Sequence, residues 1–381
     1  MKSHSRLRRL VIVVVSLAVS AGIGIVGFEM AMRFTDYRYL LAKTEFPDGY
    51  FRADAELGAD HAANVPPAIF TIRGAQFEIF TNWVGCFDRD QAIEPNYILA
   101  VGDSATWGFV PADKNWTRVL EMLSGRQVLN CGVSGEGTRF ALTKARRVIE
   151  KIGFPPSLII LLYIDNDLND DYLFPSYTAI DGQRLDRLKS VDSATGTISR
   201  SSDAELESRL RAYRVNGPHL KERIKQHSLT AWILYRLFAT DVDRKAVGSL
   251  LPSRYTVHLW DVDIEAHPWV RDAVEHHLQS FRDFRAMAAA HGTRLIVFED
   301  RTEETEPTRH RREFAARLRT ELEWVQAITM QRMAVASGKD IRYRFDDHWN
   351  DNGNRLAAKV MHEYLRAAGL LQQAAPLVKR P

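Results

Sequence analysis

The segment at residues 157–164, SLIILLYI, is apolar at almost every position and constrains the fold more than any other stretch. A strand that faces water on one side alternates polar and apolar residues, whereas a strand covered on both faces is apolar throughout. Two shorter apolar runs, at 97–102 and 127–133, precede it, and patterns typical of amphipathic helices at 115–125 and 137–153 separate the three runs. Each helical pattern ends at a glycine, a common helix terminator. This alternation predicts a parallel sheet covered by helices on both faces.

The alternation stops after the third strand and resumes about a hundred residues later. In residues 172–268 we expect an irregular loop and then helices around 205–213 and 230–238. Beyond them the pattern predicts, in order, a helix at 269–292, a strand at 293–299, a long helix at 311–334, a short strand at 341–345 and a helix at 351–368. The sequence therefore predicts one doubly wound α/β domain with a helical insertion, and insertions of this length usually shape a binding site or contact a partner.

The N-terminal region carries an uncharged apolar run at residues 10–28, directly after a basic segment. A run of about 18 or more apolar residues predicts a transmembrane helix. The basic flank predicts that residues before the run stay in the cytoplasm and the rest of the chain lies outside. A cleavable signal peptide is the alternative, because Val19-Ser20-Ala21 resembles a cleavage site. The run continues to Phe28, which favours an uncleaved anchor.

The composition of the 381-residue chain is that of a globular protein, with 45% hydrophobic and 26% charged residues. We expect a basic flank and membrane anchor at 1–33, a lead-in segment that packs on the main domain at 34–95, and the main domain at 96–381. The net charge of +3 is too small to indicate a nucleic-acid partner. The two cysteines, Cys86 and Cys131, have no metal-binding spacing. Outside the cytoplasm they could form a disulfide, with two buried free thiols as the alternative.

Small, polar and ionisable residues collect where four of the predicted strands end. Ser104 follows the first strand in the sequence Gly-Asp-Ser, and Gly135 follows the second. Asn166 follows the third, and Asp346 and His348 follow the short strand near the C-terminus. In an open parallel sheet, ligands bind beyond the carboxyl ends of the strands. The four strand ends therefore predict a common site.

These residue types suit nucleophilic catalysis. A serine hydroxyl becomes a nucleophile when a base removes its proton, and His348 is a suitable base for Ser104. A nearby carboxylate would fix the tautomer of the imidazole and stabilise its protonated form. A tetrahedral intermediate would need donors for its oxyanion, and the backbone N–H groups of Ser104 and Gly135 and the amide of Asn166 are candidates.

Each of these residues alone also has a purely structural interpretation. Ser104 could cap a helix, Gly135 could close a turn, and Asn166 could form an Asx turn. His348 could be solvated at the start of the last helix. Their joint occurrence at four successive strand ends favours the catalytic interpretation.

The four blocks, Gly102-Asp103-Ser104, Gly135, Asn166-Asp167 and Asp346-x-His348, resemble those of the SGNH (GDSL-type) hydrolases. The resemblance covers about residues 96–368 without the insertion. It implies a flavodoxin-like three-layer α/β/α sandwich and ester hydrolysis or acyl transfer with no cofactor and no metal. It further implies that Ser104 is the nucleophile, that Asp346 and His348 complete the triad, and that Ser104, Gly135 and Asn166 form the oxyanion hole. The lead-in resembles the membrane-anchored, extracytoplasmic branch of the family.

The sequence departs from the family pattern in two places. Ala105 replaces the leucine after the serine, at a packing position. The family often places its aspartate three residues before the histidine, where this chain has Phe345. Asp346 and Asp347 remain as candidates, and we predict that Asp346 orients His348.

Two acidic features are predicted to be structural. Asp103 is expected to hold the turn around Ser104. The acidic residues at 165–171 are expected to form a solvated loop rather than a cation site, because their spacing differs from that of an EF-hand.

The sequence supports three functional hypotheses. The first is a serine esterase outside the cytoplasmic membrane that removes acyl groups from a small molecule, a cell-surface glycan or a lipid. The second is an O-acetyltransferase with the same triad, in which a sugar hydroxyl intercepts the acyl-enzyme. The third is a non-catalytic component that binds or assembles glycans. An uncleaved N-terminal helix would hold the chain in the membrane, whereas cleavage would release it as a secreted protein.

Overall fold

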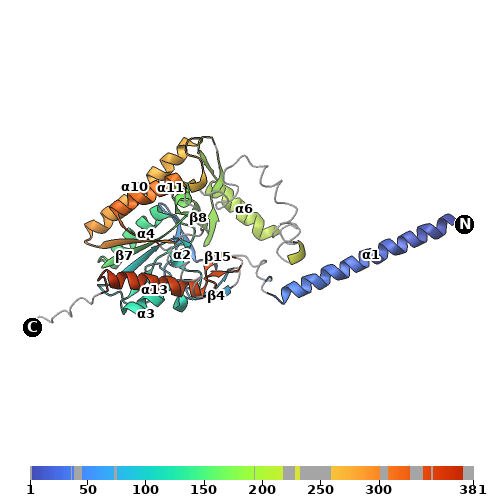
Figure 1. Ribbon diagram of the computed structural model, residues 1–381, viewed down its shortest axis with the longest axis horizontal. Helices are drawn as coiled ribbons and strands as arrows, with labels where there is room; N and C mark the ends of the chain where they lie inside the picture. Colours follow the sequence, from blue (N-terminus) through green and yellow to red (C-terminus); the bar gives the residue numbers. More distant parts are fainter. Residues whose placement is uncertain are drawn as a thin grey trace, which may run out of the picture.

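The computed structural model describes residues 2–35, 37, 45–72, 75–192, 194–217, 228–231, 259–300, 308–326, 338–344 and 346–371. Within these ranges the chain forms an α/β body and a helix, α1 (Lys2–Arg33), that projects from it (Figure 1). The segment Val11–Arg33 of α1 is exposed, and it is long and apolar enough to cross a membrane.

A sheet of five parallel strands forms the centre of the body: β5 (Ile98–Gly102), β6 (Val128–Asn130), β7 (Leu158–Ile164), β12 (Arg294–Asp300) and β13 (Glu323–Gln326). Across the sheet the order is β13-β12-β7-β5-β6. Numbered along the chain, this is the flavodoxin-like order 2-1-3-4-5, in which the winding direction reverses between β5 and β7. Ligands bind such sheets at the carboxyl ends of the two strands that flank this reversal.

Helices cover both faces of the sheet, so the predicted three-layer α/β/α sandwich is confirmed (Figure 1). Ile98 and Ala100 of β5 pack toward α3 (Trp116–Ser124) and α13 (Asp351–Ala367). Their neighbours Leu99 and Val101 point to the opposite face. That face is covered by α4 (Thr138–Ile152), α10 (Pro268–Ala290) and α11 (Arg309–Glu321).

Two sequence expectations in the C-terminal part are wrong. The helix expected at 311–334 ends at Glu321, and the chain then becomes β13, which pairs with β12. If the helix continued, the N–H and C=O groups along the edge of β12 would have no strand to bond, whereas β13 provides hydrogen-bond partners for them. The short strand expected at 341–345 corresponds to β14 (Arg342–Tyr343), which pairs with β15 (Asp346–Trp349); among the described strands, neither pairs with the central sheet. The site residues Asp346 and His348 therefore lie on a separate hairpin.

The insertion differs from the irregular loop expected at its start. It contains two antiparallel hairpins, β8 (Tyr177–Ile180) with β9 (Gln183–Asp186) and β10 (Leu188–Val191) with β11 (Ile198–Arg200), followed by α6 (Asp203–Asn216). The β8–β9 turn is Asp181-Gly182, both with positive φ, which is a favoured two-residue hairpin turn. Most of the helix expected at 230–238 lies outside the described residues.

The insertion borders the carboxyl edge of the sheet. Strand β8 packs on β1 (Phe51–Asp54) and β2 (Gly58–His61) of the lead-in. Arg184 on β9 donates a hydrogen bond to the carbonyl oxygen of Ser134, the residue before Gly135. Lead-in and insertion thus meet beside the loop that follows β6.

The lead-in packs through a group of buried aromatic residues, which we call the aromatic cluster. The lead-in contributes hairpin β1–β2 and the hairpin of β3 (Ala68–Ile72) with β4 (Ala75–Ile79). The aromatic cluster consists of Tyr50, Phe51, Phe70, Phe77, Phe87, Trp107, Phe109 and Phe140. Trp107 and Phe109 lie three and five residues after Ser104 in the chain, so the lead-in supports the segment that carries this serine.

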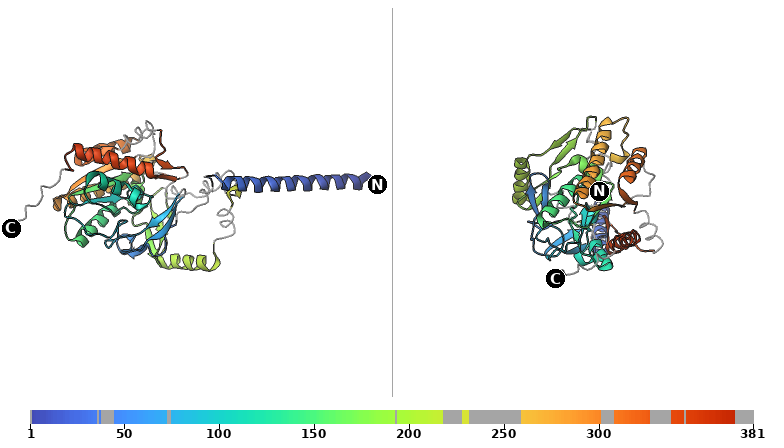
Figure 2. Two further views of the ribbon diagram at one scale, coloured as in Figure 1. Left: turned by 90° about the horizontal axis from the view of Figure 1, so that it is seen from below. Right: turned by 90° about the vertical axis from the view of Figure 1, so that its left-hand side faces the viewer.

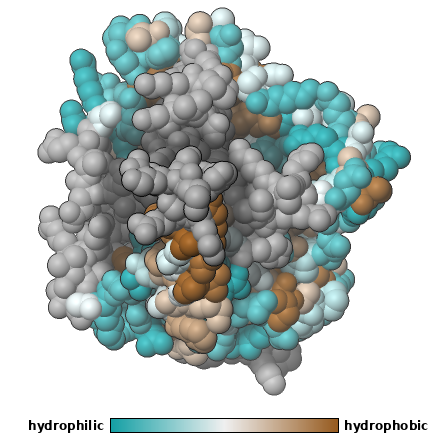
Figure 3. Space-filling model, turned by 90° about the vertical axis from the view of Figure 1, so that its right-hand side faces the viewer, coloured by the Kyte–Doolittle hydropathy of each residue, from teal (hydrophilic) through white to brown (hydrophobic). Residues whose placement is uncertain are grey.

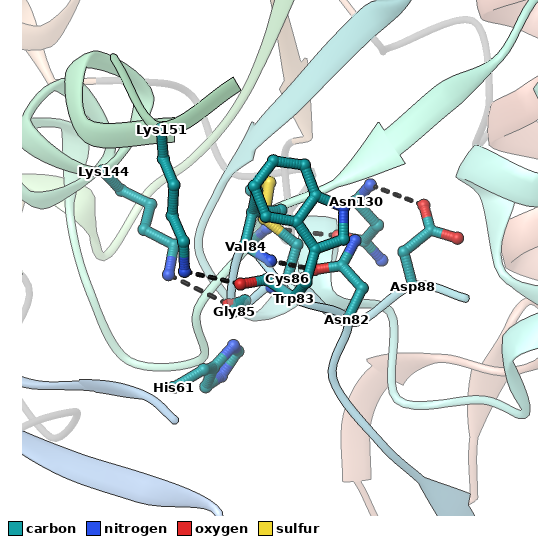
Figure 4. The surroundings of a disulfide bond; sticks show 12 residues. His61, Asn82, Trp83, Val84, Gly85, Cys86, Asp88, Asn130, Lys144 and Lys151 are labelled. Carbon is teal, nitrogen blue, oxygen red and sulfur yellow. Dashed lines mark hydrogen bonds between the residues drawn. A yellow bond between two sulfur atoms is a disulfide. The ribbon is translucent and has the colours of Figure 1, made fainter. Parts of the chain in front are cut away.

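A disulfide between Cys86 and Cys131 joins the lead-in to the end of β6 (Figure 4). Around it, Lys144 Nζ donates to the carbonyl oxygen of Gly85 at 3.0 Å, and the backbone N–H of Asn130 donates to Asp88 Oδ2 at 3.2 Å. The two cysteines are 45 residues apart in sequence. Closing a loop of that length stabilises the folded state by about 3 to 4 kcal/mol in the chain-entropy description.

Candidate active site

Ser104 lies at the carboxyl end of β5, beside β7. Strand β5 ends at Gly102, whose φ is 139°. A Cβ atom at this position would lie 2.4 Å from the carbonyl oxygen of Leu162 on β7, so only glycine allows the two strands to run this close. The chain then turns into the short helix α2 (Ser104–Trp107), and Ser104 is its first residue and is buried.

The structure brings His348 to Asp346 and not to Asp347. His348 Nδ1 is hydrogen-bonded to Asp346 Oδ1, and the backbone N–H of His348 donates to the same oxygen at 3.1 Å. Side chains two apart on a strand share a face, while the residue between them points the other way. Asp347 is exposed, and its carbonyl oxygen accepts a hydrogen bond from Arg342. With Nδ1 paired, Nε2 is the nitrogen of His348 that remains for proton transfer.

Phe109 connects the serine segment to the histidine hairpin, and the sequence analysis did not identify it. Its ring stacks on the His348 imidazole, with centroids 3.8 Å apart and an interplanar angle of 25°. Phe109 has φ of 41°, a conformation that is uncommon for a bulky residue. Tyr343 Oη donates to its carbonyl oxygen at 3.0 Å. Phe109 therefore fixes the plane of the imidazole from the chain that carries Ser104.

Arg342 is a second positioning residue that the sequence analysis missed. Its guanidinium lies 3.2 Å from Asp300 Oδ2 at the carboxyl end of β12 and also donates to the carbonyl oxygen of Asp347. Burial raises the pKa of Asp300, and the charge of Arg342 opposes that rise. Arg342 thus ties the β14–β15 hairpin to the edge of the central sheet.

Ser104 and His348 lie on neighbouring elements, since α2 packs against β15. Within the described part of the chain, no hydrogen bond joins Ser104 Oγ to His348. Hydrogen bonds of catalytic groups are often long in resting enzymes and shorten when the substrate is bound. The geometry places the two side chains on facing elements but does not pair them.

Two of the predicted oxyanion donors, the backbone N–H of Gly135 and the amide of Asn166, both donate to the carboxylate of Asp103. Its Oδ1 accepts from the backbone N–H groups of Gly135 and, at 3.1 Å, of Glu136. The amide nitrogen of Asn166 lies 2.7 Å from Asp103 Oδ2 and 2.7 Å from Asp170 Oδ2. Asp103 therefore does more than hold the turn at Ser104, because it joins the ends of β5, β6 and β7. Its carboxylate stands where these donors would otherwise bind another anionic oxygen.

The acidic residues after β7 are not the solvated loop that the sequence predicted. They begin the helix α5 (Asp167–Leu173), and Asp165, Asp167, Asp170 and Asp171 are all buried. Arg311 Nη1 binds Asp165 Oδ2 at 2.8 Å, and Asp171 Oδ2 lies 2.6 Å from Nδ1 of the buried His277. Burial raises the pKa of Asp165 to about 6, against the opposing charge of Arg311. In the described ranges, no group of three or more His, Cys, Asp or Glu side chains is arranged to bind a metal ion.

Asp167 is fully buried beside other carboxyl groups. Burial raises its pKa well above the ordinary value, and the charges of Asp103, Asp171 and Asp170 add to the rise. Its Oδ2 accepts a hydrogen bond from Thr138 Oγ1 at 3.3 Å. Asp167 is therefore neutral in the folded protein at pH values where an exposed aspartate is charged.

Replacing Asp167 with asparagine should remove part of the pH dependence of stability. In the wild type the folded state holds a proton that the unfolded chain loses above about pH 4, so the free energy of unfolding falls with rising pH, by up to about 1.4 kcal/mol per unit, until the folded-state pKa is reached. Asparagine does not ionise, so the Asp167→Asn variant should lack this loss. Denaturant unfolding at a series of pH values measures the difference, with exposed Asp347→Asn as the control. Parallel stability curves for wild type and Asp167→Asn would contradict this assignment.

No known family model matches the sequence, and no curated protein matches it. Similar solved structures include a lipolytic protein of the G-D-S-L family from Desulfitobacterium hafniense, with 10% identity and a TM-score of 0.35 over 70% of this chain and 98% of that one. A GDSL-like lipase from Bacteroides thetaiotaomicron has 11% identity and a TM-score of 0.31 over 72% and 89%. An acetyl xylan esterase from Butyrivibrio proteoclasticus has 12% identity and a TM-score of 0.35 over 78% and 70%. The chain is thus similar to GDSL-type lipolytic proteins and esterases, and at 10% to 12% identity the similarity concerns the fold alone.

Proposed function

We propose that the chain is an SGNH-type serine esterase that cleaves an acyl ester outside the cytoplasmic membrane. The observation that carries the proposal is the arrangement of His348. Its Nδ1 is bound to Asp346, and its ring is stacked on Phe109, five residues after Ser104. A histidine held by an aspartate, next to the segment that carries a serine, suits acyl transfer through a serine ester.

In the proposed reaction, Ser104 Oγ attacks the acyl carbon while His348 Nε2 takes the hydroxyl proton. The carboxylate of Asp346 stabilises the imidazolium that forms. The tetrahedral intermediate then releases the alcohol, which leaves with the proton from His348. A water molecule attacks the acyl-enzyme in the same way, so ester and water become acid and alcohol.

The backbone N–H groups of Ser104 and Gly135 and the amide of Asn166 remain the proposed oxyanion donors. Gly135 and Asn166 donate to Asp103 in the structure, so the developing oxyanion would have to share these donors with the carboxylate or replace it. Donors already turned toward a negatively charged oxygen need little rearrangement to stabilise another one.

The proposed location outside the cytoplasm rests on two features. Helix α1 includes an exposed segment, Val11–Arg33, long and apolar enough to anchor the chain in a membrane as a single span. The disulfide between Cys86 and Cys131 is of a kind that persists in oxidising compartments and is rare in the cytosol. Both features support a body that functions on the outer side of the membrane.

A fluorophosphonate probe tests the activation of the nucleophile. We expect one covalent label on the wild-type protein, mapped to Ser104 by mass spectrometry of its peptides, because only a serine with an adjacent base reacts readily. The Asp347→Asn variant should be labelled like the wild type. A label on another residue, or none on the folded protein, would overturn the proposal.

The same preparation separates hydrolysis from acyl transfer. An acetyl aryl ester is supplied together with an oligosaccharide, and the products are identified by mass spectrometry. Free acetate as the main product supports the esterase. Acetylated oligosaccharide supports the O-acetyltransferase, in which a sugar hydroxyl replaces water in the second half-reaction.

A further inference from the structure

The chain that leaves α1 contacts the hairpin that carries the proposed base. Tyr37 follows the last residue of α1, Arg33, by four positions. The guanidinium carbon of Arg344 lies 5.1 Å from the centre of the Tyr37 ring, within the range of a cation–π contact. Arg344 lies between β14 and β15, two residues before Asp346 and four before His348. Four residues of chain span at most about 14 Å, so the Cα atom of His348 lies within that distance of the Cα atom of Arg344.

A second contact joins the insertion to the same end of α1. The carboxylate of Glu29 accepts hydrogen bonds from Leu229 N–H at 3.1 Å and from Thr230 N–H and Oγ1 at 2.9 Å each. Ser228 Oγ donates to it at 3.2 Å. Glu29 is one turn before the end of α1. A segment of the insertion thus contacts the C-terminal end of α1, in addition to the contact between Arg344 and Tyr37.

The contact between Tyr37 and Arg344 lies at one end of the body. Both Figure 1 and the left view of Figure 2 show the β14–β15 hairpin and α6 at the end of the body from which α1 projects. Figure 3 views the molecule from that end, with the exposed apolar surface of α1 in the middle of the face. If α1 spans a membrane, the hairpin with Asp346 and His348 faces that membrane.

We infer that the substrate is an amphiphilic ester held in the outer leaflet by an apolar tail, with its acyl group at the membrane surface. The inference rests on the proposed esterase function and on the proposed role of α1, and it selects lipid-borne esters over esters free in solution. An active site tethered at the surface of its own bilayer meets a substrate in that bilayer at a high effective concentration. A site facing away from the membrane would have no such advantage.

The test uses the full-length chain in phosphatidylcholine vesicles and two fluorogenic acetates with the same reacting bond. One is methylumbelliferyl acetate in solution, and the other is an umbelliferyl acetate with a hexadecyl chain that keeps it in the bilayer. The tailed ester is placed either in the vesicles that hold the protein or in separate vesicles. We expect turnover of the tailed ester to be at least about tenfold faster in the shared vesicles. The soluble ester should be hydrolysed equally in both preparations.

Two variants of Tyr37 test whether the contact with Arg344 sets this preference. Tyr37→Ala removes the ring and should reduce the advantage of the shared vesicles several-fold, whereas Tyr37→Phe keeps the ring and should preserve it. Neither change should alter turnover of the soluble ester.

The outcomes distinguish this inference from the proposed function. Equal turnover of the tailed ester in shared and separate vesicles, with the soluble ester still hydrolysed, overturns the inference and leaves the esterase intact. If Tyr37→Ala keeps the wild-type ratio of turnover between shared and separate vesicles, the contact between Tyr37 and Arg344 does not set the preference. No turnover of either ester, together with no fluorophosphonate label on Ser104, overturns the esterase and the inference with it.

Discussion

Replacing Ser104 with alanine should lower turnover of a short-chain aryl ester by about 10⁴-fold or more. The methyl group of alanine cannot form the acyl-enzyme, so the residual rate comes only from substrate binding and oxyanion stabilisation. Ser104 is buried at the start of α2, and the substitution removes a single oxygen atom from a small side chain. Initial rates at several substrate concentrations measure the loss.

The control for Ser104→Ala is Ser199→Ala, at an exposed serine on β11. It should keep wild-type turnover. Circular dichroism and thermal unfolding should show that both variants remain folded. If Ser104→Ala turns over the ester at the wild-type rate, another residue is the nucleophile.

Replacing Asp346 with asparagine should lower kcat by about 10³- to 10⁴-fold. Asparagine carries no charge to stabilise the imidazolium of His348, and its amide can favour the wrong tautomer of the ring. Its side-chain oxygen can still accept the hydrogen bond from the His348 backbone N–H, so the hairpin should stay folded. The expected loss is in kcat, with little change in KM.

Asp347→Asn provides a matched control one position away. Its side chain is exposed on the other face of β15, and its contact with Arg342 uses the backbone carbonyl, which the substitution keeps. Turnover should stay within about twofold of the wild type, as for most exposed substitutions. A large loss in Asp347→Asn with none in Asp346→Asn would assign the orienting role to the other carboxylate.

Patterns that depend on local sequence predicted much of the fold. The apolar run of β7 predicted a strand covered on both faces, and Gly125 and Gly153 marked the ends of α3 and α4, where both have positive φ. The edge strand β13 was missed because residues 323–326 become a strand only by pairing with β12. The hairpin β8–β9 was missed although its Asp181-Gly182 turn is a recognisable signal.

Local sequence patterns likewise predicted some features of the candidate site and not others. Ser104, Asn166 and His348 were identified from their positions after predicted strands. The choice between Asp346 and Asp347 follows from alternation along a strand, but the apolar pattern indicates a strand at 341–345, a few residues before β15. The three hydrogen bonds to Asp103 come from residues 32, 33 and 63 positions away, so no local pattern reveals them. The stacking of Phe109 on His348 likewise depends on tertiary structure.

The aromatic cluster limits how far the chain can be shortened to obtain a protein without the apolar helix. Trp107 Nε1 donates to Tyr50 Oη at 3.1 Å, and the rings of Phe70 and Phe109 lie 5.7 Å apart. A version that began at residue 96, where the α/β pattern starts, would expose Trp107 and Phe109 to water and loosen the support on which His348 stacks. A cut between Arg33 and Glu45 would remove the apolar helix and retain this support. The boundary for protein engineering therefore lies about fifty residues before the first strand of the sheet.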